Sequence, residues 1–144
     1  MHKDFYASGF LYHLRTQQIL LQQPSAENES EWTMFSCWVN SNETAEDAFK
    51  RLMHDILKLE LKEKAISPVY KYFDERIKKD HHITYARITK LEKFPSTANT
   101  IFCWFNFKQI QKLNISPQTK HNLIVAQRVI DSALRKKLGQ QTIE

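Results

Sequence analysis

Glycine is almost absent from this chain, since Gly9 and Gly139 are the only two among its 144 residues. Glycine-rich loops that cradle phosphate groups, of the P-loop or of the dinucleotide-binding kind, need several glycines at fixed spacing. The sequence therefore excludes both kinds of loop. A phosphate group would have to be held by side chains, by a metal ion or by the end of a helix.

The length fits a single domain, residues 1–144, that buries a core of its own. Hydrophobic residues make up 42% of the chain and charged residues 26%, which is usual for a folded globular protein. Cys37 and Cys103 are too few for a disulfide framework, and residues 1–10 lack the apolar core of a signal peptide. We therefore expect a cytoplasmic protein without a membrane-spanning segment.

The net charge of +5, with a pI of about 9.2, favours polyanionic ligands without identifying one. Basic residues are spread along the chain, and the nearest approach to a basic patch is Arg135, Lys136 and Lys137. Cations at the end of a helix also complement the helix dipole. We favour this structural role over a contact with nucleic acid.

The order of strand and helix patterns predicts a mixed sheet with helices packed on it. Residues 10–23 form two apolar runs around a polar turn at 15–18, which indicates a β-hairpin. The aromatic segment 32–39 predicts another strand. Three further strands are expected in this order: 65–73, 82–91 and 100–107.

Thr44 and Asp47 mark the start of a helix, because this spacing is that of a capping box. Apolar spacing extends the helix from about residue 45 to residue 59. Arg51 lies one turn from Asp47 and from Asp55 at the edge of the apolar face, so that ion pairs are possible there. The face itself consists of Ala45, Ala48, Phe49, Leu52, Met53 and Ile56.

Ser116 and Pro117 predict the start of the last helix, as a capping residue followed by a first-turn proline. Apolar residues at helical spacing carry it to about residue 138. Gly139 follows directly and is a typical residue just past a helix end. We therefore expect a C-terminal helix over about 117–138.

Residues 32–61, WTMFSCWVNSNETAEDAFKRLMHDILKLEL, resemble the signature of the Nudix hydrolases, G-x5-E-x7-R-E-U-x-E-E-x-G-U. The two align over residues 37–59 without a gap. The first glutamate of the box falls on Glu43, its arginine on Arg51 and an apolar position on Met53. Residues 9–23 and 100–134 are similar to the opening hairpin and to the closing strand, turn and helix of that family.

Five positions of the box carry other residues. Its glycines fall on Cys37 and Lys58, and two of its glutamates fall on Leu52 and Ile56. A third glutamate falls on Asp55, which keeps a carboxylate on a shorter side chain. The resemblance implies Mg²⁺ or Mn²⁺ held between these carboxylates and a substrate diphosphate, and such hard cations need oxygen ligands. Leucine and isoleucine supply none.

The resemblance implies an α/β fold of the α+β kind, a Nudix-like α/β/α sandwich with a mixed sheet. It implies a remnant catalytic set of Glu43, Arg51 and Asp55, with Asp55 and Glu43 as weak metal ligands. Trp38 stands closest to the expected ligand cleft and is the candidate for stacking on a nucleobase. Carboxylates elsewhere could complete a metal site, and the candidates are Glu60, Glu63, Asp74 and Glu75.

Three functions remain open. The first is a homologue of nucleoside diphosphate-X pyrophosphohydrolases whose metal-dependent hydrolysis is weak or lost, a pseudoenzyme that retains nucleotide binding. The second is a module that binds RNA or another protein, including a second copy of itself in a homodimer. The third is an active hydrolase that uses carboxylates outside the box together with Mg²⁺ or Mn²⁺.

Cys37 is also a conceivable nucleophile if His81 or His82 activates its thiol. Nothing in the spacing brings these residues together, and we expect a buried cysteine in place of a glycine. The two adjacent histidines would point to opposite faces of a strand. We expect them to lie in a charged connection rather than in a metal site.

Overall fold

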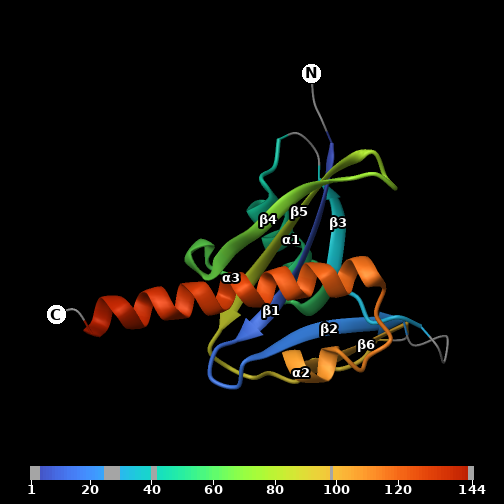
Figure 1. Cartoon of the computed structure of the whole chain (residues 1–144). Helices are drawn as coiled ribbons and strands as arrows, with labels where there is room; N and C mark the ends of the chain where they lie inside the picture. The colour runs from blue at the N-terminus through green and yellow to red at the C-terminus, as the bar shows by residue number, and fades with distance from the viewer. Residues whose placement is uncertain (1–3, 25–29, 40–41, 98, 143–144) are drawn as a thin grey trace.

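The computed structural model describes residues 4–24, 30–39, 42–97 and 99–142. Figure 1 shows a mixed sheet with helices on both of its faces. The elements follow the order β1 (Phe5–His13), β2 (Gln18–Pro24), β3 (Phe35–Val39), α1 (Ala45–Leu57), the 3-10 helix η1 (Glu63–Ala65), β4 (Ile66–Asp74), β5 (Lys79–Ile88), β6 (Thr100–Asn106), α2 (Phe107–Ile110) and α3 (Pro117–Thr142).

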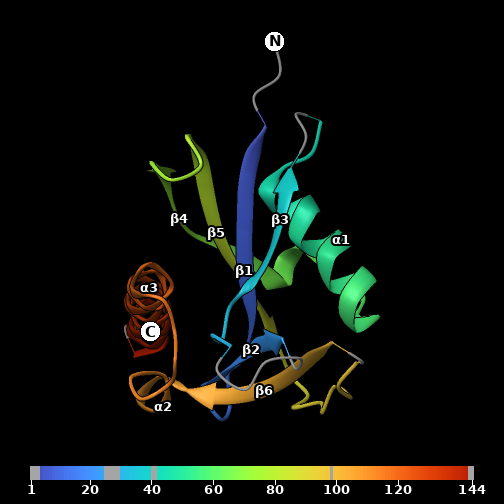
Figure 2. The same ribbon diagram turned by 90° about the vertical axis from the view of Figure 1, so that its right-hand side faces the viewer.

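Strand β1 lies at the centre of the sheet, whose order is β4-β5-β1-β2-β6 with β3 paired to β1. One edge of β1 runs parallel to β5. The other edge is divided, because residues 5–9 pair with β3 and residues 11–13 pair with β2. Figure 2 shows α1 on one side of this sheet and α3 on the other, which confirms the predicted α/β/α sandwich.

The predicted hairpin is formed by β1 and β2, although β1 begins at Phe5 rather than near residue 10. Its turn has no glycine, and Gln17 takes the left-handed backbone conformation with φ of 57°. His13 stabilises the turn, since its Nδ1 lies 2.8 Å from Oγ1 of Thr16 and accepts from the Thr16 N–H at 3.2 Å. A local polar contact thus replaces the glycine that such turns usually use.

Helix α1 begins where its cap predicts, because Oγ1 of Thr44 accepts from the N–H of Asp47 at 3.0 Å. It ends at Leu57, two residues before the predicted end. Lys58 adopts φ of 57° and its N–H donates to the carbonyl of His54. This left-handed residue stands at the position that the resemblance aligns with the last glycine of the box, and glycine is the usual residue for this conformation.

Gly9 allows α1 to approach the sheet closely. A Cβ atom at this position would lie 2.5 Å from Cε1 of Phe49 on α1 and 2.7 Å from the carbonyl oxygen of Thr84 on β5. Such distances are far inside van der Waals contact. Glycine is therefore required at the crossing of β1 and α1.

Two large hydrophobic clusters fill the two sides of the sheet, and a smaller one of Ala7, Val39 and Ala48 lies on the α1 side. Alternation along β1 sends Phe10 and Tyr12 toward α3 and Leu11 toward α1. The α3-side cluster also contains Ile19, Leu21, Ile83, Tyr85, Leu123, Ala126 and Ile130. The α1-side cluster contains Leu11, Leu20, Phe35, Phe49, Leu52, Met53, Leu57, Leu61, Ile66 and Ala86.

Helix α3 starts at its predicted cap, since Oγ of Ser116 accepts from the N–H of Thr119 at 3.2 Å. It continues to Thr142, so the predicted stop at Gly139 is wrong. A single glycine inside a helix costs only about 1 kcal/mol relative to alanine, which the rest of a long helix can absorb. In Figure 1 the C-terminal part of α3 extends beyond the sheet. Within the described part of the chain, no helix has both the length and the apolar content of a membrane span.

Candidate functional site

Glu43 and Arg51 form a two-point ion pair at the start of α1. Nε of Arg51 donates to Oε2 of Glu43 and Nη2 donates to Oε1, each at 2.9 Å. Arg51 thus pairs with Glu43 and not with Asp47 or Asp55, the partners that the sequence suggested. Both oxygens of Glu43 are engaged in fixing the loop before α1 to the helix.

Asp55 lies on the solvent side of α1, with 61% of its side chain exposed. Its Oδ1 is 3.7 Å from Nδ1 of His54, and Nε2 of His54 is 2.9 Å from Oε1 of Glu60. Asp55 and Glu60 are therefore both drawn to the imidazole of His54. These exposed contacts contribute little to the stability of the fold.

The two box positions that lack glutamate contribute to the hydrophobic core. Leu52 is 8% exposed and belongs to the α1-side cluster, and Ile56 packs against the same cluster. Phe94, from the segment that follows β5, packs there as well. Nε1 of Trp104 donates to the carbonyl of Glu92 at 2.7 Å and holds this segment to β6. Carbon atoms fill the face where box glutamates would present oxygens.

The residues of this region do not fit an Mg²⁺ or Mn²⁺ site. Across the described residues, no three His, Cys, Asp or Glu side chains gather in a way that could hold a metal ion. The other candidate carboxylates lie apart: Glu63 is on η1, Glu75 pairs with Lys78, and Asp74 belongs to the opposite side of the sheet. A divalent cation needs several oxygen ligands at once. We therefore derive no hydrolytic step from this helix.

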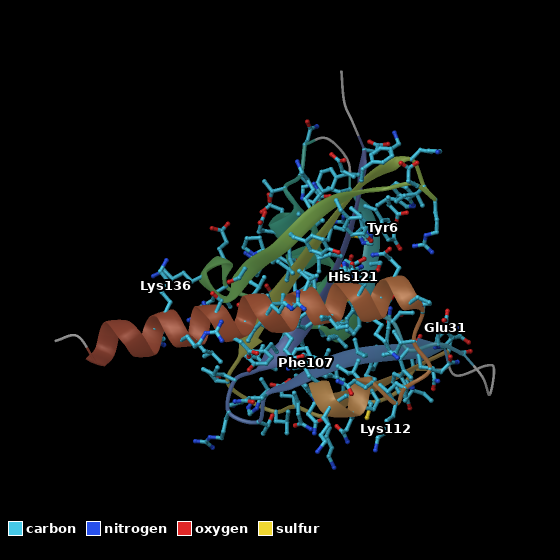
Figure 3. The ribbon with its side chains drawn as sticks, viewed as in Figure 1. Tyr6, Glu31, Phe107, Lys112, His121 and Lys136 are labelled. Carbon is cyan, nitrogen blue, oxygen red and sulfur yellow. The ribbon has the colours of Figure 1, made fainter. Side chains whose placement is uncertain are left out.

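A polar cleft of about 400 Å³ lies on the opposite side of the sheet, between the strands and the N-terminal end of α3. Side chains from β1, β3, β5 and α3 line it, and most of them carry hydrogen-bonding groups. Among them are Ser8, Ser36, His81, Gln118, Thr119 and Asn122, with Arg76 and Glu31 as the charged members. Figure 3 shows Tyr6 and Glu31 in this part of the molecule. The cleft is lined by polar atoms, whereas the apolar face of α1 on the other side of the sheet presents carbon.

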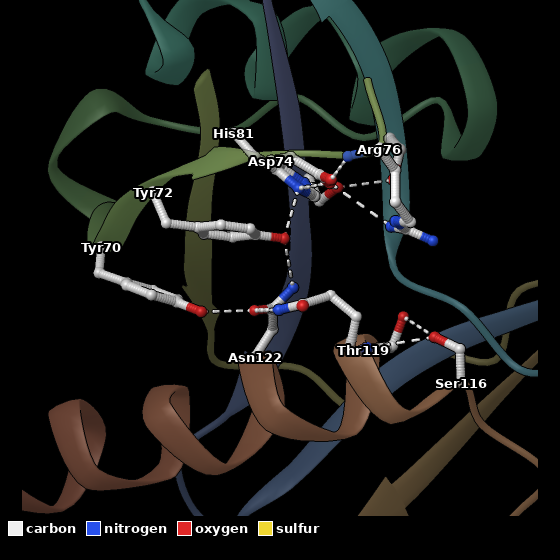
Figure 4. Close-up of polar contacts among 11 residues, drawn as sticks. Tyr70, Tyr72, Asp74, Arg76, His81, Ser116, Thr119 and Asn122 are labelled. Carbon is white, nitrogen blue, oxygen red and sulfur yellow. Dashed lines mark hydrogen bonds and ion pairs between the residues drawn. The ribbon is translucent and has the colours of Figure 1, made fainter. Parts of the chain in front are cut away.

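A continuous hydrogen-bond network crosses from β4 to α3 beside this cleft (Figure 4). The hydroxyl of Tyr70 donates to Oδ1 of Asn122 at 2.6 Å, and Nδ2 of Asn122 donates to Oη of Tyr72 at 3.3 Å. Oη of Tyr72 lies 2.7 Å from Nδ1 of His81. The network thus joins the sheet to the first turns of α3.

The network continues from His81 into the cleft. Nε2 of His81 lies 2.7 Å from Oγ of Ser8, which in turn lies 2.8 Å from Oγ of Ser36. Strand alternation explains this arrangement, because Ser8 on β1 is the partner of Ser36 on β3 and both point to the α3 side. A row of side chains therefore links His81 to the opposite wall of the cleft.

Asp74 is the buried charge of this network, with 5% of its side chain exposed. Its Oδ1 accepts from the N–H of Arg76 at 3.0 Å, and its Oδ2 accepts from Nη2 of Arg76 at 3.4 Å and lies 3.6 Å from Nδ1 of His81. Burial raises the pKa of Asp74, but the hydrogen bonds and charge of Arg76 outweigh it and lower the pKa below its ordinary value. The carboxyl is therefore ionised at neutral pH.

His81 is neutral at neutral pH. Burial lowers the pKa of His81 by more than the nearby charge of Asp74 raises it. The expectation that the two histidines lie in a charged connection is wrong for both, because β5 begins at Lys79 and contains them. The expected opposite orientation is confirmed: His81 faces Ser8, whereas the ring of His82 lies 4.3 Å from that of Phe5.

Ser8, His81 and Asp74 follow one another in the contact order of a Ser-His-Asp triad. Ser8, however, lies in the middle of the central strand, where residue Ser36 of β3 and residue Ile83 of β5 flank it. Its backbone groups belong to the sheet, so its own N–H does not serve as an oxyanion donor. The contact order alone therefore does not make Ser8 a nucleophile.

Cys37 belongs to the other side of the sheet, where it packs against Ala7 and Val39. Burial raises the pKa of the Cys37 thiol. Since His81 lies on the α3 side, it does not activate this thiol. Cys37 packs against this cluster as expected, but it is half-buried rather than buried.

Trp38 lies beside Tyr6, which lines the cleft, and has 51% of its surface exposed. It meets Tyr6 edge to face, with ring centroids 5.0 Å apart, and Tyr6 meets His81 in the same way at 4.9 Å. An aromatic row thus leads from the solvent to the buried network. The sequence analysis singled out Trp38 and, as a possible metal ligand, Asp74, but neither Tyr6 nor Asn122. The two-residue period of Tyr70, Tyr72 and Asp74 could have placed these three residues on one face of β4.

No family model and no curated protein sequence matches the chain. Solved structures do match it. A MutT/nudix family protein from Listeria innocua has a TM-score of 0.70 at 17% identity, over 90% of this chain and 95% of that one. The NUDIX domain of Shewanella oneidensis NrtR, solved with ADP ribose, has a TM-score of 0.68 at 12% identity, over 89% and 88%.

An Ap4A hydrolase from C. elegans, solved as a binary complex, has a TM-score of 0.66 at 14% identity, over 88% of this chain and 98% of that one. These likenesses extend over nearly the whole chain, while the identities are low. They show that the chain has the fold of the Nudix hydrolases, as the resemblance of residues 37–59 implied.

Proposed function

We propose that this chain is a nucleotide-binding protein on a Nudix fold, in which metal-dependent hydrolysis is weak or lost. The observation that carries the proposal is the contrast between the two sides of the sheet. On the α1 side, Leu52 and Ile56 pack into the core. On the α3 side, a polar cleft is lined by side chains able to donate and accept hydrogen bonds. The α3 side thus offers groups that can bind a ligand, whereas the α1 side lacks the oxygen ligands that a metal ion needs.

The cleft suits a nucleoside derivative with a negative charge. Its neutral polar groups match the edges of a nucleobase and the hydroxyl groups of a ribose. Arg76, whose side chain is largely exposed beside the cleft, offers a cation to a phosphate group. Related folds support this class of ligand, since the Shewanella domain was solved with ADP ribose. In this proposal Trp38 stacks on the exposed face of the base.

Any residual hydrolysis would depend on Asp55, with Glu43 and Arg51 shaping the loop before it. Asp55 is the only carboxylate at the three glutamate positions of the box on the helix. One monodentate ligand binds Mg²⁺ or Mn²⁺ weakly. A role for Glu60, Glu63, Asp74 or Glu75 in an active enzyme would require these residues to move toward it.

The proposal is tested with purified protein and a panel of nucleoside triphosphates, nucleoside monophosphates, ADP-ribose and dinucleoside polyphosphates. Product formation is measured with Mg²⁺ and with Mn²⁺, and thermal shift is measured with the same ligands in the presence of EDTA. We expect a ligand-dependent rise in melting temperature without turnover. Robust Mg²⁺-dependent turnover that disappears in Asp55→Ala would overturn the loss of hydrolysis.

A second candidate function is an RNA-binding or protein-interaction module. The exposed side chains of Arg135, Lys136 and Lys137 favour it, because they lie on the projecting part of α3. Figure 3 shows Lys136 pointing away from the sheet. Binding of single-stranded RNA that weakens steeply with salt would identify the RNA version. Concentration-dependent sedimentation would identify a homodimer.

A further inference from the structure

We propose that Asp74 sets the direction of hydrogen bonding in the cleft through His81, so that the cleft selects ligands that donate a hydrogen bond at Ser36. The inference rests on the proposed nucleotide-binding function and names the kind of ligand edge that the cleft recognises. Asp74 is in this account a positioning residue, since it acts on the ligand through His81, Ser8 and Ser36.

The starting point is the tautomer of His81. A neutral imidazole carries one proton, on Nδ1 or on Nε2. Nδ1 lies 2.7 Å from Oη of Tyr72, and Nε2 lies 2.7 Å from Oγ of Ser8. Both partners are hydroxyl groups, which donate or accept equally well. These two contacts alone therefore allow either tautomer.

Asp74 removes this ambiguity. Its Oδ2 lies 3.6 Å from Nδ1 of His81, and the side chains of both residues are nearly fully buried. The distance is too long for a strong hydrogen bond, but a carboxylate attracts a ring N–H and repels a ring lone pair at this range. Arg76 holds the carboxylate ionised by donating to both of its oxygens. The proton of His81 therefore resides on Nδ1.

The rest of the network agrees with this choice. Oδ1 of Asn122 accepts from the hydroxyl of Tyr70 and from Nε2 of Gln118, at 2.6 and 3.0 Å, which fixes the orientation of the amide. The Nδ2 group of Asn122 then donates to Oη of Tyr72. This oxygen has two lone pairs and accepts from Nδ1 of His81 as well.

The direction of the remaining bonds follows. With its proton on Nδ1, His81 accepts through Nε2 from the hydroxyl of Ser8. The hydroxyl proton of Ser8 is used in its bond to His81. In the 2.8 Å contact between the two serines, Ser36 is therefore the donor and Ser8 the acceptor. Oγ of Ser36 then turns its free lone pair to the cleft. A ligand N–H fits there, such as an exocyclic amine or a ring N–H of a nucleobase.

The tautomer is measured directly by ¹⁵N NMR of protein labelled at histidine, with the His81 signal identified by its loss in His81→Gln. We expect Nδ1 to show the shift of a protonated nitrogen and Nε2 that of an unprotonated one. Asp74→Asn is expected to increase the population protonated on Nε2. Glu75→Gln is the matched control, because this neighbouring carboxylate pairs with Lys78 at the surface and leaves the tautomer unchanged.

Ligand preference is measured with pairs of nucleotides that differ by one amino group. AMP is compared with purine riboside 5′-monophosphate, and GMP with inosine 5′-monophosphate. Loss of one neutral hydrogen bond weakens binding by about 3- to 10-fold, so the amino member of at least one pair should bind more tightly by this factor. In Asp74→Asn the ratio should fall toward 1.

The two proposals fail in different ways. An Nε2 tautomer in the unaltered protein, or a tautomer that Asp74→Asn leaves unchanged, would overturn the role of Asp74 whether or not nucleotides bind. Equal binding of both members of every pair would overturn the selection for donors. An Nδ1 tautomer without binding of any nucleotide would contradict the proposed function, and the ligand preference with it, while the role of Asp74 on His81 would stand.

Discussion

Glu43 and Arg51 meet through two parallel hydrogen bonds of 2.9 Å, at the two positions where the Nudix box also places a glutamate and an arginine. The pair joins the loop before α1 to the second turn of the helix and leaves no carboxylate oxygen of Glu43 without a donor. It is a structural contact that needs no metal. Leu52 and Ile56, which the resemblance aligns with glutamates of the box, present carbon to the core instead.

The ion pair should contribute to stability independently of divalent cations. Because both side chains are partly exposed, Glu43→Gln is expected to lower the free energy of unfolding by only about 0.5–1 kcal/mol. The loss should be equal in Mg²⁺ and in EDTA, as measured by urea unfolding. Lys136→Gln, which also removes one charge from the surface, serves as a control. A larger loss in Mg²⁺ than in EDTA would mean that Glu43 binds metal.

Truncation of Leu52 and of Asp55 should have very different effects on stability. Leu52→Ala removes buried carbon from the α1-side cluster and is expected to cost about 2–3 kcal/mol of unfolding free energy. Asp55→Ala removes an exposed side chain and should change stability by less than about 0.5 kcal/mol. Chemical denaturation compares the two directly. Equal effects would contradict the assignment of Leu52 to the core.

Lys58→Gly should stabilise the protein. Lys58 has φ of 57°, a conformation that favours glycine over residues with a Cβ atom. Relief of this strain, offset by the greater freedom of glycine in the unfolded chain, should yield about 0.5–1 kcal/mol. Lys62→Gly is the matched control, because Lys62 has φ of −88° and should gain nothing. Differential scanning calorimetry reports both changes.

Gly9→Ala should be strongly destabilising. The added methyl group would meet Phe49 at 2.5 Å and the backbone oxygen of Thr84 at 2.7 Å, and a backbone oxygen cannot rotate away as the end of a flexible side chain can. Overpacking of this kind costs about 1–3 kcal/mol. Gly139→Ala is the comparison, since a glycine within a helix gains up to about 1 kcal/mol from this change. Because the C-terminal end of α3 extends beyond the sheet, the gain at Gly139 should appear as less fraying in amide exchange, whereas Gly9→Ala should lower the urea midpoint.

Stability should fall as the pH is lowered from 7. The folded-state pKa of His81 is lowered by burial, so the unfolded chain binds more protons below its ordinary pKa of about 6.5. The lowered pKa of Asp74 adds a second loss below about 3.9, as the pH falls toward its folded-state value. The two effects have the same sign. In each case the unfolded chain binds more protons than the folded protein, so the unfolded chain is favoured as the pH falls.

His82 contributes in the same window as His81, because burial lowers its pKa as well. Unfolding free energies between pH 7 and 5 are therefore compared for the unaltered protein, His81→Gln and His82→Gln. Each variant should show a smaller slope against pH than the unaltered protein. An unchanged slope in His81→Gln would contradict the neutral state assigned to His81.

The starts of α1 and α3 could be predicted because their signals are local. Thr44 and Ser116 cap N–H groups three residues away, and such contacts form wherever the helix forms. The C-terminal ends of the two helices were harder to predict. Lys58 terminates α1 from the left-handed region without being glycine, and Gly139 remains inside α3 although it is glycine. Residue type alone therefore misplaced both ends.

The cleft could not be predicted because its contacts are distant in sequence. Ser8 and His81 are 73 residues apart, and Tyr70 and Asn122 are 52 apart. Only the pairing of β1 with β5 and the packing of α3 on β4 bring them together. The motif drew attention to α1, whereas the polar groups converge on the other side of the sheet.

Because α3 projects beyond the sheet, the backbone amides in its two halves open in different ways. Near Asn122 and Ala126 the helix is buried against the sheet, so its amides open only when the packed core opens. From Asp131 to Lys137 nearly every side chain is exposed, and the backbone there is protected by the helix alone. Amide hydrogen exchange should therefore quicken by orders of magnitude along a single continuous helix. The slow end would report global unfolding of the domain, and the fast end would report fraying.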